Sequence, residues 1–537
     1  MTLERDRTAV APALHTNLAA IQLDSRARFF AAAIIALGSI SSILSSTTIN
    51  VAIPTLQRVF HAELTSVQWV ISGYLLGLAA VIPLSGFLSE RFGAKRVYLS
   101  TLGTFIAASV LCGLAWSIGS EIAFRVIQGM AGGMVMPVGM AMLMRMTPPQ
   151  ERGRMMGFLG VPMLLAPAVG PALGGLLIQS FDWQWIFWVN IPVCALALGL
   201  GFRGLQDSQR AGGGRLDLVG LVLCTPGVVA IIYGLTRASG GAGWGSLEVL
   251  GSVVGGLVLI AAFVVWELRQ SEPLLDLRIF RDAAFAGSSV VNVILGAALF
   301  GAVFIVPVFL QQVQGYGTLN AGLIIGAQGV GAALVMPISG WLTDRFGPRI
   351  VVFCGVAALA VASALLTTIT PDTSASLWVG LLLVRGIAMG FSMMPNQSAA
   401  YVTLAPAAIG RATAINNTLQ RLASSLGIAI LASAATVRIA SHLGALPTTP
   451  ITHPIGHSNA ARAVEMAVAA GFVDTLWLAV GISVLALPGA LLLRRPLLGL
   501  PLGTPHPPLS NGLRTTVFLL ALLSTALFLL SLARTFF

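Results

Sequence analysis

The sequence predicts an all-α protein that crosses a membrane many times, and three observations predict this class. The chain of 537 residues is 56% hydrophobic and only 9% charged, with a mean hydropathy of +0.89, whereas a soluble protein carries about a quarter charged residues. Its apolar residues gather in runs that are long enough to cross roughly 30 Å of hydrocarbon as helices. Its basic residues stand in short groups between these runs, as in the loops of membrane proteins.

Fourteen apolar segments of about 18–25 residues are predicted to be spans. They cover residues 29–53, 68–88, 97–116, 120–144, 155–178, 184–202, 216–236, 247–267, 285–310, 320–343, 350–370, 376–400, 412–437 and 466–493. A fifteenth apolar segment, 515–533, follows the Pro-rich linker 496–508, and whether it crosses the membrane is left open. Residues 1–28 are polar, and no small-residue cleavage site follows the first apolar run, so this run is predicted to be a retained span.

The loop charges predict the orientation. With the N-terminus in the cytoplasm, most basic residues fall in inward loops, as the positive-inside rule requires. The outward loops then hold only Arg58, Arg237, Arg438 and Arg462. Because the basic residues are scattered in this way, the net charge of +11 indicates membrane topology and not a nucleic-acid partner. We therefore expect a multi-pass protein of the inner (plasma) membrane.

An internal repeat divides the chain. The segment 86–95 (GFLSERFGAK) recurs as 340–349 (GWLTDRFGPR), and Arg125 and Arg385 occupy matching places in the two halves. Parallel six-span repeats are a transporter plan with a binding cavity at their interface. The expected divisions are an N-terminal cytoplasmic segment 1–28, a six-helix bundle 29–202, two inserted spans with their loops 203–284, a second six-helix bundle 285–495, and a linker with a hydrophobic tail 496–537.

The repeated loop is a candidate conformational latch. Glu90 and Asp344 end their spans where each carboxylate could pair with an arginine or cap a neighbouring helix N-terminus. Such a charge cluster can hold one state of a two-state protein and release the other. Topology marking is the alternative, but it does not explain why the same pattern occurs twice. The latch candidates are Gly86, Glu90, Arg91, Gly93, Lys95, Gly340, Asp344, Arg345 and Gly347.

The fifth span is a candidate hinge. It contains two prolines, which bend helices, and three glycines, which let a neighbouring helix approach closely. These residues are Pro167, Gly170, Pro171, Gly174 and Gly175. A close-packed helix pair without any motion is the alternative.

These motifs together resemble the major facilitator superfamily, and within it the fourteen-span drug:proton antiporters. The doubled loop, Arg125-x-x-Gln128-Gly129 in the fourth span, and Gly157 followed by Gly170-Pro171-x-x-Gly174-Gly175 in the fifth are similar to motifs of that superfamily. So are the segments 44–54 (LSSTTINVAIP), 185–192 (WIFWVNIP) and 272–280 (EPLLDLRIF). The resemblance covers roughly residues 30–495. It implies the major facilitator fold, with two six-helix bundles and two extra central helices, together with multidrug export and proton exchange.

One residue departs from the pattern of that family. Ser45 stands where the family usually has an aspartate in the first span, and no other Asp or Glu lies near the middle of any predicted span. A buried acid can cycle between charged and neutral forms and can pair with cationic drugs. Its absence therefore leaves the usual proton-for-cation exchange in question.

Coupling must then depend on other groups. Arg125, Arg385 and Arg421 are predicted to lie inside spans, where arginine is costly and by default a functional candidate. Glu121 precedes Arg125 by four residues on one helix face, a spacing that favours pairing. The coupling candidates are Glu121, Arg125, Gln128, Gly129 and Arg385. A purely structural ion pair at the outer rim is the alternative.

The candidate substrate cavity combines hydroxyl groups of the first span with methionines of the fourth. Methionine adapts to irregular ligands, although it more often fills a core or faces lipid. The cavity candidates are Ser45, Thr48, Asn50 and Met134.

The predicted function is export of drugs or other hydrophobic or amphipathic small molecules by alternating access, coupled to proton influx. Export of neutral or anionic metabolites with atypical coupling is the alternative, because of Ser45. An enzyme is not expected, because no histidine lies inside a span, and a sensor would need an appended soluble domain. The four cysteines, which all fall in apolar runs, are predicted to be small buried hydrophobic residues, and they indicate neither disulfides nor a metal site. No cofactor, metal or nucleic acid is expected, and a periplasmic adaptor is left open.

Overall fold

The computed structural model describes residues 25–148, 151–206, 216–238, 243–271, 273–404, 408–444 and 457–493. Within these ranges all regular structure is helical, and no strand occurs. The N-terminal 24 residues and the segment 515–533 lie outside the described residues, so the possible extra span stays open.

Helices of the first half follow the order of the predicted spans. They are α2 (Ser25–Phe60), α3 (Leu64–Val81), α4 (Leu84–Phe92), α5 (Ala94–Gly113), α6 (Ile118–Met146), α7 (Arg152–Ser180), α8 (Trp185–Trp188) and α9 (Asn190–Gly204). The α3 and α4 segments follow each other closely and are bent by 55° relative to one another. Pro83 lies at this bend, where its missing N–H interrupts the helical hydrogen bonds.

The remaining helices comprise the inserted pair and the second half. The inserted helices are α10 (Leu218–Arg237) and α11 (Leu247–Glu267). The second half consists of η3 (Leu277–Arg281), α12 (Ala283–Gln312), α13 (Thr318–Phe346), α14 (Pro348–Leu365), η4 (Leu366–Thr368), α15 (Ala375–Ala399), α16 (Ile409–Gly444) and α17 (His457–Leu492).

Every one of the fourteen predicted segments coincides with a described helix or helix pair. Eleven described helices are long and apolar enough to cross a membrane, and the bent α3–α4 pair would make twelve. The other two, α7 and α12, are 29 and 30 residues long, which also suffices for a bilayer. The chain is thus a multi-pass membrane protein.

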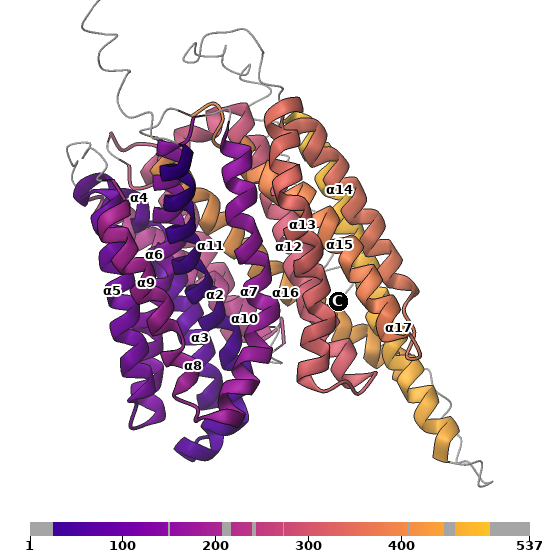
Figure 1. The fold of residues 1–537 in the computed structure, drawn as a ribbon. Helices are drawn as coiled ribbons and strands as arrows, with labels where there is room; N and C mark the ends of the chain where they lie inside the picture. Colours follow the sequence, from indigo (N-terminus) through magenta and orange to yellow (C-terminus); the bar gives the residue numbers. More distant parts are fainter. Residues whose placement is uncertain are drawn as a thin grey trace, which may run out of the picture.

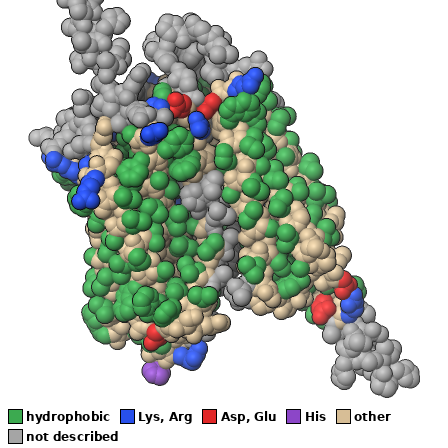
Figure 2. Space-filling view, in the orientation of Figure 1, with side chains coloured by type: hydrophobic (Ala, Val, Ile, Leu, Met, Phe, Trp, Pro, Cys, Tyr) green, Lys and Arg blue, Asp and Glu red, His purple; other side chains and the backbone are tan. Residues whose placement is uncertain are grey.

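The helices form two bundles that lie side by side (Figure 1). The bundles contact each other through α7 with α13 and through α4 and α6 with α16. The inserted helix α10 contacts α3 of the first half and α16 of the second. In Figure 1 the bundles are close at the end that carries α4, and the α17 side diverges from the first half toward the opposite end. Most of the Lys and Arg side chains visible in Figure 2 lie near the α4 end.

In both halves a glycine allows two neighbouring helices to pack closely. A Cβ at Gly129 of α6 would lie 2.1 Å from the carbonyl oxygen of Tyr74 on α3, and a Cβ at Gly386 of α15 would lie 2.0 Å from that of Gln328 on α13. No real Cβ tolerates such distances, so only glycine allows these helices to approach so closely. The corresponding helix pairs of the two halves therefore both pack closely through a glycine.

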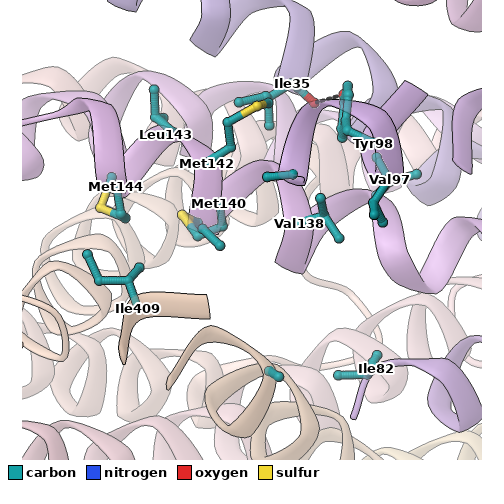
Figure 3. Packing of buried hydrophobic residues seen from close by; sticks show 14 of the residues in the cluster. Ile35, Ile82, Val97, Tyr98, Val138, Met140, Met142, Leu143, Met144 and Ile409 are labelled. Atoms are coloured by element: carbon teal, nitrogen blue, oxygen red, sulfur yellow. Dashed lines mark hydrogen bonds between the residues drawn. The ribbon is translucent and has the colours of Figure 1, made fainter. Parts of the chain in front are cut away.

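The methionines of α6 divide between core and surface. Met140, Met142 and Met144 are buried in the largest apolar cluster, where Ile409 of α16 joins them (Figure 3). Met130 is 43% exposed on the outer surface of the bundle. Most methionines of this stretch therefore fill the core and do not line a substrate cavity.

One expectation about the cysteines is wrong. Cys112, Cys194 and Cys224 are buried, but Cys354 is exposed on α14. An apolar run alone cannot distinguish a side chain that faces the bundle from one that faces outward. All four are free thiols, and the described residues form no group of metal-ligating side chains.

Candidate functional site

Arg125 lies at the centre of a buried polar network in the first half. Its side chain is fully buried, and its Nη1 donates to Ser45 Oγ at 2.9 Å and to Gln128 Oε1 at 2.6 Å. Its Nη2 donates to the carbonyl oxygen of Ser45 at 3.3 Å, and its Nε donates to that of Val70 at 3.1 Å. Neutral oxygens from α2, α3 and α6 thus take up most of the guanidinium donors.

Further polar groups fix this network. Gln128 Nε2 donates to Ser109 Oγ on α5 at 2.8 Å, which orients the amide so that its oxygen faces Arg125. The Arg125 guanidinium lies 4.2 Å from the centroid of the Tyr74 ring, a cation–π distance. Tyr74 in turn donates its hydroxyl to the carbonyl oxygen of Ser42 at 2.7 Å. The network therefore ties α2, α3, α5 and α6 together.

The expected pair between Glu121 and Arg125 does not form. Glu121 is fully buried, yet among the described residues neither of its carboxylate oxygens has a hydrogen-bond partner. The donors of Arg125 point instead to Ser45, Gln128 and Val70. The i to i+4 spacing brings the two side chains to one helix face but does not decide which acceptor the guanidinium takes.

The second half contains a simpler counterpart. Arg385 on α15 is 1% exposed, and its Nη1 donates to Gln328 Oε1 on α13 at 2.7 Å. Its Nε is buried without a partner among the described residues. An arginine–glutamine pair thus occurs in both halves, although the glutamine comes from the same helix in one half and from a neighbouring helix in the other.

The first latch candidate joins the two halves at the α4 end. Glu90 Oε2 accepts from Arg411 Nη2 at 3.0 Å and from Arg411 Nε at 3.2 Å, in the first turn of α16. Gly86 faces the same turn, since its Cβ would lie 3.3 Å from Arg411 Cα. The Glu90 side chain is only 13% exposed, which reduces the screening of this ion pair by water.

The second latch candidate forms a mirrored contact. Asp344 Oδ2 on α13 accepts from the backbone N–H of Arg154 at 3.1 Å, in the first turn of α7. A carboxylate at a helix N-terminus is stabilised by the free N–H groups and the helix dipole. A third contact between the halves runs from Arg152 Nη1 to the carbonyl oxygen of Tyr401. Each repeated acid therefore contacts the first turn of a helix from the opposite half.

The glycines of the hinge candidate contact the first span. A Cβ at Gly170 would lie 2.0 Å from Thr47 Oγ1, and a Cβ at Gly174 would lie 2.9 Å from the carbonyl oxygen of Thr48. A Cβ at Gly175 would meet nothing closer than Val51 Cγ1 at 3.9 Å, so this glycine is not needed for the approach. The α7 helix is continuous from Arg152 to Ser180, and the bend expected at its prolines stays a prediction.

A small cavity lies between the halves. Its volume is about 30 Å³, and α2, α3, α6 and α16 line it with Ser39, Ser42, Ile43, Leu78, Ile82, Gly132, Gly133, Met136, Pro137, Asn417 and Arg421.

Of the four predicted cavity residues, the three with described side chains do not belong to this lining. Ser45 binds Arg125, and Thr48 is buried against α7. Met134 packs against the core, and the side chain of Asn50 lies outside what the structure describes. The hydroxyl-rich face of the first span and one methionine of the fourth do line the cavity, but through Ser39, Ser42 and Met136.

Several residues of the site were not predicted from the sequence. Arg411 is 321 positions from Glu90, and the pairing of Gln328 with Arg385 depends on the packing of α13 against α15. Tyr74 and Ser109 carry no motif of their own. For Gln328 alone a signal existed, because a lone glutamine in an apolar run needs a polar partner.

Comparison with protein families gives one match over most of the chain. The profile of the Major Facilitator Superfamily matches residues 35–428. The multidrug resistance protein B homolog of Mycobacterium tuberculosis (strain ATCC 25618 / H37Rv) is 37% identical over 408 residues, which cover 74% of this chain and 75% of that protein. The puromycin resistance protein pur8 of Streptomyces alboniger is 32% identical over 444 residues, which cover 82% of this chain and 88% of that protein.

Solved structures share the fold at low identity. The human organic anion transporter MFSD10 (TETRAN) aligns with a TM-score of 0.59 and 16% identity, over 85% of this chain and 99% of that chain. The proton:xylose symporter XylE aligns with a TM-score of 0.57 and 15% identity, over 87% of this chain and 95% of that chain. At such identities the likeness concerns the fold alone.

Proposed function

The chain belongs to the major facilitator superfamily, and we propose that it exports drugs or other hydrophobic and amphipathic small molecules by alternating access, in exchange for protons. It is a membrane transporter and not an enzyme. The names of its relatives, which concern multidrug, lincomycin and puromycin resistance, support drugs as the substrate class. The gathering of basic residues at the α4 end supports a cytoplasmic location for that end, in the plasma membrane.

The mirrored contacts at the α4 end carry the proposal of alternating access. Glu90 and Asp344 come from equivalent loops, and each contacts the first turn of a helix in the other half. These contacts join the two halves at the α4 end, which we propose is the cytoplasmic end. Opening that end requires both contacts to break, so they stabilise one of the two states of a rocking transporter.

Glu121 is proposed as the proton carrier, with Arg125 of the same helix as the nearby positive charge. Glu121 is buried on α6, four positions before Arg125, and it has no hydrogen-bond partner in the described part of the chain. Burial without a partner favours the neutral carboxyl group, and a path to water favours its ionised form. A change in access between the two states can therefore load and release one proton.

Weakening the latch is expected to slow the transport of every substrate. We expect Glu90→Gln to slow export about fivefold, since a partly buried ion pair contributes roughly 1 kcal/mol, while binding affinities stay nearly unchanged. Export rates and affinities for several compounds would be measured on the same preparation. Glu151→Gln is the matched control, because Glu151 also forms an ion pair at this end but with Arg28 of its own half. A loss confined to one substrate, with weaker binding of that substrate, would mean that Glu90 lines the binding site.

Restoring the acid of the family is expected to change the preferred charge of the substrate. In Ser45→Asp the new carboxylate would lie beside Arg125 Nη1, which is 2.9 Å from Ser45 Oγ, and would cancel its charge. A unit charge roughly 10 Å away at an effective dielectric constant of about 20 changes the energy of a cation by about 1.7 kcal/mol, so export of tetraphenylphosphonium should rise roughly fifteenfold. Ser45→Asn introduces a side chain with the shape of aspartate but without its charge, and it should leave the export of tetraphenylphosphonium unchanged. Equal effects of both substitutions would contradict this account.

A direct test of the substrate class uses bacterial cells that lack their own major drug exporters. Expression of this chain should lower the accumulation of several chemically unrelated amphipathic drugs and raise resistance to them. The Arg125→Gln variant, present at the same level in the membrane, should do neither. If the intact protein changes neither the accumulation nor the toxicity of any of them, drug export is not its function.

A further inference from the structure

Arg421 is a positive charge in the cavity between the two halves. It comes from α16 in the second half, while the other cavity walls come mainly from α2, α3 and α6 of the first half. Its side chain is partly buried and lines the same cavity as Ser42, Asn417 and Met136. An arginine far from both ends of a membrane helix is costly, and such residues mark the paths of substrates.

Among the described residues the guanidinium of Arg421 has no hydrogen-bond or ion-pair partner. This distinguishes it from three other arginines that lie inside the protein. Arg125 and Arg385 donate to glutamine oxygens, and Arg411 binds the carboxylate of Glu90. A charge that faces a cavity without a partner can take one from a ligand, at no loss of an existing contact.

The charges around the cavity also favour an anionic ligand. The neighbours of Arg125 and Arg385 are neutral amides, hydroxyl groups and carbonyls, so neither charge is cancelled by a carboxylate. Among the described residues, Glu121 is the acid that is buried on the helix of Arg125, and burial without a partner favours its neutral form. Ser45, which donates no charge to the first span, leaves the positive charge of Arg125 uncompensated at this point. The field in the cavity is therefore positive.

We propose that Arg421 binds the anionic head group of amphipathic substrates, so that organic carboxylates are a preferred substrate class of this exporter. This inference rests on the proposed export function and specifies its substrates. The cavity of about 30 Å³ has room for about two water molecules, which is close to the size of a carboxylate group. Ser42 and Asn417 supply polar atoms beside Arg421, while Leu78, Ile82 and Met136 form an apolar wall for the rest of the molecule.

The test compares two ligands that differ only in charge. The probes are 2-naphthoate and its neutral isostere 2-naphthamide, with tetraphenylphosphonium as a cationic probe. Binding to the purified full-length protein and export from proteoliposomes would be measured for the intact protein and for Arg421→Gln, Arg421→Lys and Arg438→Gln. Arg438 is the matched control, since it is an exposed arginine on the same helix.

The expected result is a selective loss. Arg421→Gln should weaken the binding of 2-naphthoate about tenfold or more, as the loss of a charge-assisted hydrogen bond predicts, and should leave 2-naphthamide nearly unaffected. Arg421→Lys keeps the charge but loses the two-pronged geometry, so it should retain part of the affinity. Arg438→Gln should behave like the intact protein.

Three results would overturn the inference, and each has a different meaning. If the intact protein exports 2-naphthamide and tetraphenylphosphonium but not 2-naphthoate, the preference for anions is wrong and the proposed export function stands. If Arg421→Gln weakens both naphthalene ligands equally and Arg421→Lys does not restore binding, Arg421 has a structural role. If the intact protein exports none of the three probes, the proposed export function fails together with the inference.

Discussion

Replacing Glu121 by Gln is expected to abolish uphill export while leaving the downhill exchange of substrate intact. Glutamine has the shape of a glutamic acid side chain but cannot take up or release a proton. Glu121 is fully buried, and neither of its carboxylate oxygens has a partner among the described residues, so no structural hydrogen bond is lost in the substitution. The effect should therefore fall on the proton cycle and not on folding.

Two measurements in proteoliposomes distinguish an effect on the proton cycle from an effect on folding. Accumulation of substrate against its gradient, driven by an imposed pH difference, should fall to the equilibrium level in Glu121→Gln. Exchange of labelled for unlabelled substrate without any gradient should continue at a rate close to that of the intact protein. Glu248→Gln is the control, because Glu248 is an exposed acid that forms an ion pair with Arg237 at the surface. Intact uphill transport in Glu121→Gln would exclude Glu121 as the proton carrier.

A single methyl group at Gly170 is expected to reduce transport at least tenfold. The Cβ in Gly170→Ala would lie 2.0 Å from Thr47 Oγ1 and 2.8 Å from Thr47 Cβ, so α7 must move away from α2. Overpacking of this kind typically costs about 1–3 kcal/mol, which the helices can relieve by separating. We expect the protein to insert and fold but to lose transport at least tenfold, because the rocking motion needs α2 and α7 to remain in contact.

Gly175→Ala is the matched control for this prediction. It adds the same methyl group to the same helix, but its Cβ would meet its nearest neighbour, Val51 Cγ1, at an ordinary distance of 3.9 Å. Transport by Gly175→Ala should equal that of the intact protein, with both variants compared at equal amounts of folded protein in size-exclusion chromatography. If Gly170→Ala transports normally, the close contact between α2 and α7 has no part in the mechanism.

The spans could be predicted from the sequence because length and hydropathy are local properties. Each span must satisfy its own backbone hydrogen bonds in the bilayer, so an apolar run of sufficient length becomes a helix whatever its neighbours are. The positions of Glu90 and Asp344 at helix ends could be predicted for the same reason. Their partners could not, since Arg411 and the backbone of Arg154 come close only after the halves assemble.

The contacts of the candidate site depend on how the helices pack, which spacing along the sequence does not reveal. The spacing of Glu121 and Arg125 predicts a pair, but Arg125 instead takes acceptors on α2 and α3 that the spacing does not reveal. Met134 lies on the same span as Met136, yet only Met136 reaches the cavity, because the direction of each side chain depends on the rotation of α6 against its neighbours. The sequence marked Ser45 as unusual, because an aspartate was expected at this position. Its contact with Arg125 could not be predicted, because it depends on the packing of α2 against α6.

The most direct test of proton-coupled export is made on the unmodified protein. Purified protein would be reconstituted in liposomes, a pH difference would be imposed, and the movement of 2-naphthamide would be followed together with the internal pH. Substrate should accumulate on the acidic side, protons should move in the opposite direction only when substrate is present, and a protonophore should abolish both movements. Accumulation that persists with the protonophore, or proton movement that does not depend on substrate, would contradict the account.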